Sequence, residues 1–394
     1  MNYRKLKQEE IDLSFDMSSY AFQYALSDEE REERREWVYP ENTWVAEENG
    51  EILSKATTIP FNVFYHGQSI AMGGVSGVAT WPEQRRSGLV KNLLAHSLQE
   101  MKEKGQIVSF LFPFSIPFYR KYGWELFADT QTITLTREQL PKRKETNGYV
   151  RRIKPSIDVL QPVYDAWAKL YNGTIDRHED WWKRSVFKRK KGNVAVYYNG
   201  DSEAKGYMIY EVKEEKMTIK ELISLTPESR DGLWTFIANH DSMIKSVVLK
   251  TTPHDGMPFL LDDPKVSREV TSYFMARIVD VKSFLSYVPF KQTDDEKPLI
   301  FHVTDEFCEW NHGTFVIGPK ESNIQFFPFK KEGSCTHEPK RGCRLSIQTL
   351  SALLFGSQRP DMLIREGLIE GEEHELNRLI GSIPYQPAFI YDFF

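Results

Sequence analysis

Two arginines, a serine and a glycine stand where an extended stretch of the chain gives way to a helix. Beyond Gly88, apolar residues recur with the spacing of one helical face, at Leu89, Leu93, Leu94, Leu98 and Met101. Residues 84–88 are therefore predicted at a helix N-terminus, where unpaired amides and the helix dipole attract an anion. Arg85 and Arg86 add positive charge, and a glycine lets the backbone approach a bulky group. The combination suits a pyrophosphate, although the glycine could instead pack the helix on a strand while the arginines face water.

The elements on either side of this stretch predict how it is held. Turn signals at Asn49-Gly50 and His66-Gly67 divide the segment 43–80 into antiparallel hairpins. The apolar run at 107–114 predicts a buried strand, which a short helix at 115–125 and a last strand at 130–136 follow. Residues 14–39 are predicted to be helical. Together these elements predict a three-layer α/β unit that ends near residue 140.

Two motifs of this unit resemble those of a known superfamily. The pattern R-x-x-G-x-(small) between a strand and a helix resembles the acetyl-coenzyme A loop of the GNAT acetyltransferases, with Val90 where glycine or alanine is commoner. The run 118–125 is similar to the superfamily's F-Y-x-x-x-G-F element, with Tyr119, Gly123 and Trp124 in register. The resemblance implies a GNAT fold that binds acetyl-CoA.

The middle of the chain echoes this helix start. Residues 225–240 follow the pattern of 81–96 once a one-residue gap is allowed, and in both copies a histidine lies eight residues after the glycine. Chance similarity between two helix starts is the alternative, but the echo favours an internal duplication. Asp231 of the second copy would repel a phosphate, so the second copy is predicted to be degenerate.

A duplicated GNAT fold followed by a third domain resembles the enhanced-intracellular-survival (Eis) acetyltransferases, whose third domain is like a sterol carrier protein. The segments 343–369 and 387–394 look like that domain. Linkers are predicted at 141–156 and 290–298. The expected fold class is α/β (α+β), with a catalytic GNAT domain at 1–145, a degenerate GNAT-like domain at 146–287 and a sterol-carrier-protein-like domain at 288–394. The resemblance also implies a homo-oligomer, with a hexamer as the expected form.

The resemblance places the cofactor in the first domain. Backbone amides at 78–80 would bind the pantetheine arm, and one of them would polarise the thioester carbonyl. Gly73 and Gly74 are predicted to pack against the same arm. The predicted cofactor-binding residues are Val78, Ala79, Thr80, Arg85, Arg86, Ser87, Gly88, Leu89, Val90, Lys91, Phe114 and Ser115.

An amine acceptor dictates the proton transfers. Alkyl amines have a pKa near roughly 10.4, so a base must remove a proton before attack, and the departing thiolate, with a pKa of about 8.5, needs a proton. The resemblance implies Tyr119 as the general acid and the terminal carboxylate of Phe394 as the general base, with Asp392 and then Glu125 as fallbacks. The alternatives are a tyrosine that only fills the core and a frayed chain end. The apolar run at 387–394 favours burial of that end.

The acceptor side is less defined. Phe22 and Trp37, on the first helical stretch, are predicted to line it, with ordinary packing as the alternative. The acidic run at 28–33 could attract a cation, but it is interleaved with arginines, which is typical of an exposed helix face.

Composition argues against several other classes of protein. The net charge is −5 over 394 residues, which argues against a dedicated nucleic-acid binder. No secretory signal and no stretch long enough to span a bilayer is visible, so a cytoplasmic protein without membrane insertion is expected. Cys308, Cys335 and Cys343 lack the spacing of a metal site, so reduced thiols and no metal are expected.

The expected function is transfer of an acetyl group from acetyl-CoA to a primary amine by direct attack in a ternary complex. The acceptor would be a small molecule, such as an aminoglycoside or a polyamine, or a lysine side chain. The alternative, which the third domain suggests, is a non-catalytic carrier of acyl-CoA or lipid. Only the enzyme would release coenzyme A.

Overall fold

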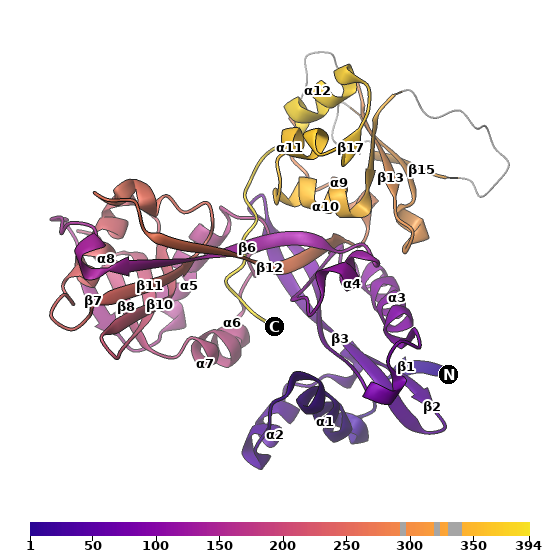
Figure 1. The fold of residues 1–394 in the computed structure, drawn as a ribbon, viewed down its shortest axis with the longest axis horizontal. Coiled ribbons are helices and arrows are strands. Elements are labelled where there is room, and N and C mark those ends of the chain that lie inside the picture. Colours follow the sequence, from indigo (N-terminus) through magenta and orange to yellow (C-terminus); the bar gives the residue numbers. More distant parts are fainter. Residues whose placement is uncertain (292–296, 319–323, 330–340) are drawn as a thin grey trace.

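The computed structural model describes residues 1–291, 297–318, 324–329 and 341–394. Within these ranges the strands form two sheets, one of twelve strands and one of five. The larger sheet extends through the first two thirds of the chain, and the smaller one belongs to the last third (Figure 1). The predicted linker at 290–298 lies partly outside the described residues, and Cys335 lies outside them.

The first part of the larger sheet consists of hairpins followed by two strand–helix connections, in the predicted order. In both hairpin turns the two central residues have positive φ, which reaches +87° at Gly50 and +77° at Gly67, as two-residue hairpin turns require. The elements are β1 (Asn2–Lys5), α1 (Ile11–Phe22), α2 (Asp28–Arg35), β2 (Thr43–Glu48), β3 (Glu51–Tyr65), β4 (Gln68–Thr80), α3 (Leu89–Glu103), β5 (Val108–Leu111), α4 (Ile116–Arg120) and β6 (Glu125–Thr136).

The helical stretch predicted at 14–39 is in fact two helices, α1 and α2, with a turn between them. The Ser27 hydroxyl accepts a hydrogen bond from the Glu30 amide at 3.2 Å, and the Glu30 carboxylate accepts one from the Ser27 amide at 2.9 Å. This capping box starts a new helix, because it satisfies amides that a continuous helix would have bonded to carbonyls.

One strand in the first part of the large sheet comes from a segment far along the chain. β12 (Ser267–Ile278) lies between β5 and β6 and pairs antiparallel with both. The far half of β6 also pairs with β11 (Ser246–Thr251) of the second part. The order is β1-β2-β3-β4-β5-β12-β6-β11-β10-β9-β8-β7, so β6 and β12 cross from one part to the other (Figure 1). The unit predicted to end near residue 140 is therefore incomplete without β12.

The second part repeats the first. β10 (Lys216–Ser224) and β11 pair in parallel, and α8 (Pro227–Ala238) connects them along the chain. In the same way, β4 and β5 pair in parallel and α3 connects them. The helix start differs, because Gly232 lies inside α8, where an added Cβ would be 2.4 Å from the Tyr197 ring. The remaining elements are β7 (Tyr149–Ile153), α5 (Ile157–Ala168), α6 (Glu179–Trp181), a π-helical turn (Trp182–Val186), α7 (Phe187–Arg189), β8 (Asn193–Tyr198) and β9 (Ala204–Lys213).

The last third forms the five-stranded sheet, in the order β15-β14-β13-β16-β17. Its core is continuous with that of the first part, because the Phe355 ring lies 5.4 Å from Phe110 and 5.2 Å from Phe127, centroid to centroid. No helix in the described ranges is both long and apolar enough to cross a membrane. The elements are α9 (Val281–Leu285), β13 (Leu299–Thr304), β14 (Gly313–Ile317), β15 (Ile324–Pro328), β16 (Cys343–Ser346), α10 (Ile347–Phe355), α11 (Pro360–Arg365), β17 (Ile369–Glu370) and α12 (Glu373–Ser382).

One fully buried side chain, that of Asn172, joins the three parts. Its carbonyl accepts a hydrogen bond from the His66 amide at 2.9 Å, and its amide donates to the carbonyls of Phe355 at 3.0 Å and Gln386 at 3.1 Å. Its backbone also pairs with the segment 387–389. Asn172 therefore determines where the last residues of the chain cross the second part.

Replacing this residue, Asn172→Ala, leaves a buried amide and two buried carbonyls without their partner. The free energy of unfolding should fall by about 3 kcal/mol, because each unsatisfied buried group costs about 1–3 kcal/mol. Urea unfolding followed by circular dichroism measures this. The matched control is Asn147→Ala, since the exposed Asn147 side chain has no hydrogen bond within the described residues. Equal stability of the two variants would contradict the prediction.

Candidate active site

The site begins where two parallel strands part. β4 and β5 pair only from Met72 opposite Val108 to Val75 opposite Leu111. Beyond that point, Ala79 and Thr80 pair with β3 alone among the described strands, and a register shift at 77–78, with Gly77 at φ +58°, bends β4. Val78, Ala79 and Thr80 therefore lie along an open strand edge, where a polar chain can form hydrogen bonds with the backbone.

The loop into α3 presents a row of free amides, as predicted for an anion site. The first backbone bond of the helix runs from the Asn92 amide to the Gly88 carbonyl at 3.4 Å, and no described residue accepts from the amides of 86–91. Arg86 and Gly88 have φ of +67° and +83°. These left-handed residues turn the chain sharply into the helix, so that successive amides converge in front of it.

The side chains of this loop divide into two sets. Arg85, Arg86 and Lys91 are exposed, and none has an ion pair with another described residue, so all three are free to meet a ligand's phosphates. Leu89 is buried and Val90 is half-buried, and both pack under the helix. Among the predicted cofactor residues, these two can therefore contribute only their backbone.

Tyr119 lies on α4, just after the chain leaves β5. It is 3% exposed, with Phe114 at 5.3 Å between ring centroids. Burial raises the pKa of Tyr119 well above its usual value. Its hydroxyl has no hydrogen-bond partner among the described residues. Phe114 is 67% exposed, and Ser115 is the N-cap of α4, so both lie in the short segment that joins β5 to the helix of Tyr119.

Phe394 packs on the other face of the sheet. Gly74 and Val75 are consecutive on β4, so they face opposite sides. A Cβ on Gly74 would lie 2.7 Å from the Phe394 ring, whereas Val75 belongs to the buried cluster of Tyr119. Tyr119 and Phe394 therefore flank, from opposite faces, the place where β4 and β5 part. The Phe394 ring is 4.9 Å from that of Phe61.

Gly73 and Gly74 accommodate groups other than the predicted one. Gly73 and Gly74 were expected to make room for the cofactor arm. Instead, a Cβ on Gly73 would lie 2.7 Å from the Met101 sulfur, and Gly74 makes room for Phe394. The two glycines thus admit protein side chains, one on each face of β4.

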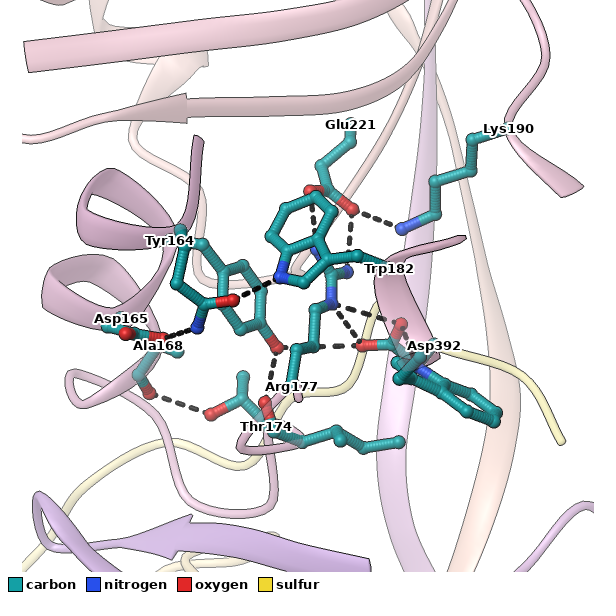
Figure 2. A network of polar contacts seen from close by, with 12 residues as sticks. Tyr164, Asp165, Ala168, Thr174, Arg177, Trp182, Lys190, Glu221 and Asp392 are labelled. Carbon is teal, nitrogen blue, oxygen red and sulfur yellow. Dashed lines mark hydrogen bonds and ion pairs between the residues drawn. The ribbon is translucent and has the colours of Figure 1, made fainter. Parts of the chain in front are cut away.

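A buried ionic network anchors the segment that leads to Phe394 (Figure 2). Arg177 donates from Nε to both Asp392 oxygens at 3.1 Å, and from its terminal nitrogens to the two Glu221 oxygens at 2.9 Å. The Trp181 indole donates to Asp392 at 3.0 Å, and Lys190 also pairs with Glu221. Burial alone would raise the pKa of Glu221, but the two cations lower it below its usual range.

The two fallback bases are engaged elsewhere. Both oxygens of Asp392 accept from Arg177, so this carboxylate anchors the chain. Glu125 accepts from Arg120 at 2.6 Å and from the Leu126 amide at 2.8 Å. Neither carboxylate is placed as a base for an incoming amine.

The two residues predicted for the acceptor side lie at the ends of the two helices that follow β1. Phe22 ends α1, which packs against Ala79 of β4, and is 51% exposed. Trp37 follows α2 and packs under the Arg184 guanidinium of the second part. A role of either residue in acceptor binding stays a prediction. No described group of three or more His, Cys, Asp or Glu could hold a metal ion, and the absence of a metal stays a prediction.

Comparison with known proteins assigns each of the three parts of the chain to a domain family. Residues 2–127 and 173–278 each match an acetyltransferase (GNAT) domain, and residues 281–390 match a sterol carrier protein domain. The N-acetyltransferase Eis of Mycobacterium tuberculosis is 22% identical over 340 residues, which are 80% of each chain. The chain is an Eis-like GNAT acetyltransferase. The predicted tandem GNAT folds and sterol-carrier-protein-like domain are confirmed.

Solved structures share this whole Eis-like architecture. A probable N-acyltransferase of Enterococcus faecalis is 25% identical with a TM-score of 0.88, over 100% of this chain and 99% of that chain. Eis1 of Mycobacterium abscessus is 18% identical with a TM-score of 0.82, over 100% of both chains. An uncharacterised N-acetyltransferase of Streptomyces avermitilis is 26% identical over 65% of this chain and 68% of its own length. The chain spans 64% of a similar relative from Streptomyces griseus.

Several residues that build the site escaped the sequence analysis. Arg177, Glu221 and Asn172 are polar residues that the sequence places in unremarkable surroundings. Their partners lie far away, since 215 positions separate Arg177 from Asp392. The one local signal is the pair Gly73-Gly74 within a strand, which marks a close approach without saying what approaches.

Lys55 is another residue that the sequence did not single out. It lies on β3 opposite Ala79, is 4% exposed, and donates from Nζ to the Ser14 hydroxyl at 2.7 Å. No carboxylate among the described residues pairs with it. Burial lowers the pKa of Lys55 to about 7. A partly uncharged amine is thus buried beside the cofactor strand.

Two glycines of positive φ, at the two ends of α3, allow a matched comparison. Gly88 and Gly105 have φ of +83° and +71°, and an added Cβ meets nothing within 4 Å at either. Gly88→Ala and Gly105→Ala should each lose about 1 kcal/mol of stability, because alanine resists this conformation. Only Gly88→Ala should weaken coenzyme A binding, by about tenfold, which costs about 1.4 kcal/mol. Isothermal titration calorimetry measures the affinity of each variant for coenzyme A. Equal affinities of the two variants would contradict the assignment of the loop as the pyrophosphate site.

The buried Lys55 predicts that the stability of the protein depends on pH. Between pH 7 and 10.5 the unfolded chain binds a proton at Lys55 that the folded protein does not, so stability rises with pH in this window. From pH 7 to pH 9 the wild type should gain about 2 kcal/mol relative to Lys55→Met. Urea unfolding at both pH values measures this. Lys216→Met, at an exposed position, should keep the wild-type slope; parallel slopes for wild type and Lys55→Met would refute the prediction.

Proposed function

We propose that this protein transfers an acetyl group from acetyl-CoA to a primary amine, by direct attack in a ternary complex. One observation carries the proposal: Tyr119 and Phe394 flank, from opposite faces, the point where β4 and β5 part, and the free amides before α3 lie at the end of the same opening. The family matches support acetyl transfer, and the alternative of a non-catalytic carrier is not favoured.

The cofactor would bind along the first domain. Its pyrophosphate would accept hydrogen bonds from the amides of 86–91 and meet Arg85, Arg86 and Lys91. Its pantetheine arm would follow the open edge at 78–80, with Phe114 and Ser115 beside the thioester. An amide of that edge would donate to the thioester oxygen, which gains negative charge during attack.

The proton transfers would use the two faces of the sheet. The terminal carboxylate of Phe394 would take a proton from the amine, directly or through water, and the neutral nitrogen would attack the thioester carbonyl. The C–S bond would then break as Tyr119 donates its proton to the departing thiolate, the nitrogen would release its second proton to solvent, and Tyr119 would be reprotonated from solvent. Its raised pKa keeps Tyr119 protonated throughout the assay range, so it stays a donor.

A coenzyme A release assay tests the function. Purified protein, acetyl-CoA and a panel of aminoglycosides, polyamines, amino acids and lysyl peptides should yield free thiol with at least one amine. Bound coenzyme A without thiol release across the panel would overturn the proposal. The hexamer, the cytoplasmic location and the absence of nucleic-acid partners stay predictions, and sedimentation equilibrium tests the first.

Tyr119→Phe removes the proposed proton donor while keeping the ring. Its kcat should fall by about 10²-fold, the usual scale for loss of an acid–base group, while the Kd for coenzyme A changes less than about twofold. Tyr122→Phe, one turn further on, should leave kcat unchanged. An unaltered kcat in Tyr119→Phe would show that another group protonates the thiolate.

Two residues added after Phe394 move the carboxylate away from its site. The extended protein should lose about 10²-fold in kcat and keep its affinity for coenzyme A. The same two residues added before Met1, an exposed position, are the control. Full activity of the extended protein would exclude the terminal carboxylate as the base.

A further inference from the structure

A cavity of about 370 Å³ adjoins the last residues of the chain. Its floor is the large sheet, at β6, β10, β11 and β12, and its walls are α7, the π-helical turn before it and the segment 391–393. Phe393, in this wall, lies 5.1 Å from the Phe112 ring, which follows β5. The cavity therefore opens next to Phe394 and the parted strands.

Four cations and a single carboxylate are among the described residues that line the cavity. The carboxylate is Asp392, and the cations are Arg189, Lys190, Lys220 and Lys250. Three of these five charges are already neutralised by groups within the fold. Asp392 pairs with Arg177, Lys190 pairs with Glu221, and Lys220 pairs with Glu211 at 3.0 Å.

Arg189 and Lys250 are left without a carboxylate. Neither forms an ion pair with any described residue. Instead, the Lys250 ammonium lies 3.9 Å from the centroid of the Tyr273 ring, and the Arg189 guanidinium lies 5.0 Å from that of Phe393. Glu269, opposite Thr132 in register, is exposed and pairs with neither of them.

The surroundings reinforce this positive charge. Lys250 is half-buried, and burial followed by the neighbouring Lys190 lowers the pKa of Lys250. Arg34 of α2 adds a further positive charge near Arg189, and Asp392, which pairs with Arg177, is the negative charge nearby. A cation held in this way gains from an anion that enters the cavity, because it is already partly desolvated and has no carboxylate partner.

We infer that the amine acceptor also carries an anionic group, a carboxylate or a phosphate, which binds between Arg189 and Lys250. This inference rests on the proposed function, since it assigns the cavity to the acceptor. The acceptor's anion would lie in the cavity and its amine would reach past Phe393 to the carboxylate of Phe394. An amino acid, a peptide with a free C-terminus or a phosphorylated amine fits this description, whereas a polycation would be repelled.

Matched pairs of amines that differ by one anionic group test the inference. Lysine is compared with cadaverine, ornithine with putrescine, a lysyl dipeptide with its C-terminal amide, and phosphoethanolamine with ethanolamine. In each pair that reacts, the wild type should favour the anionic member by about tenfold in kcat/KM, the scale of one charge-assisted hydrogen bond. The first three pairs report a carboxylate and the last reports a phosphate.

The double variant Arg189→Gln, Lys250→Gln should reduce this preference to about twofold or less, because kcat/KM for the anionic member falls and kcat/KM for the cationic member does not. Lys183→Gln, an exposed neighbour that pairs with Glu179 outside the cavity, should keep the full preference. Lys250→Glu should reverse the preference toward the cationic member.

The outcomes separate the two proposals. If no amine in the panel releases coenzyme A, the proposed function fails and the inference fails with it. If amines are acetylated but the anionic member has no advantage, or keeps its advantage in the double variant, the anionic acceptor is refuted and acetyl transfer stands.

Discussion

The fully buried guanidinium of Arg177 imposes the arrangement on which the active site depends. A charge can be buried only if it is paired and fully hydrogen-bonded, and its two partners here come from β10 and from the segment before Phe394. Removing one partner of such a pair costs about 3–5 kcal/mol. The segment cannot leave its place without stranding this charge, so Phe394 stays against Gly74 of β4.

The same site draws on all three parts of the chain. The first part supplies the parted strands, the loop and Tyr119, and the last third supplies Phe394. The second part, whose corresponding helix start is closed by the Thr226–Ser229 capping box, supplies the anchor, because Arg177, Glu221 and Asn172 all belong to it. The degenerate GNAT copy thus acts as a frame that positions the end segment against its active neighbour.

Sequence reasoning could reach only motifs that are local in the chain. The loop at 85–91 and Tyr119 were predicted because each motif is one contiguous run whose residues act together. It failed where partners are distant: 44 positions separate Arg177 from Glu221, and no pattern in either neighbourhood indicates the other. Gly73-Gly74 predicted a close approach but named the wrong group. The break between α1 and α2 was missed although its signal, Ser27 with Glu30 three residues later, is present in the sequence.

The position of β12 has a consequence for synthesis. β5 and β6 leave the ribosome long before the strand that lies between them, and roughly 130 residues separate β6 from β12. At about 5–20 residues per second, their facing edges stay unpaired for roughly 10 s. Unpaired edges are templates for pairing with other chains. A nascent chain that stalls within the second part would therefore carry an aggregation-prone first part, and the topology itself makes shielding by chaperones, or rapid translation of that part, advantageous.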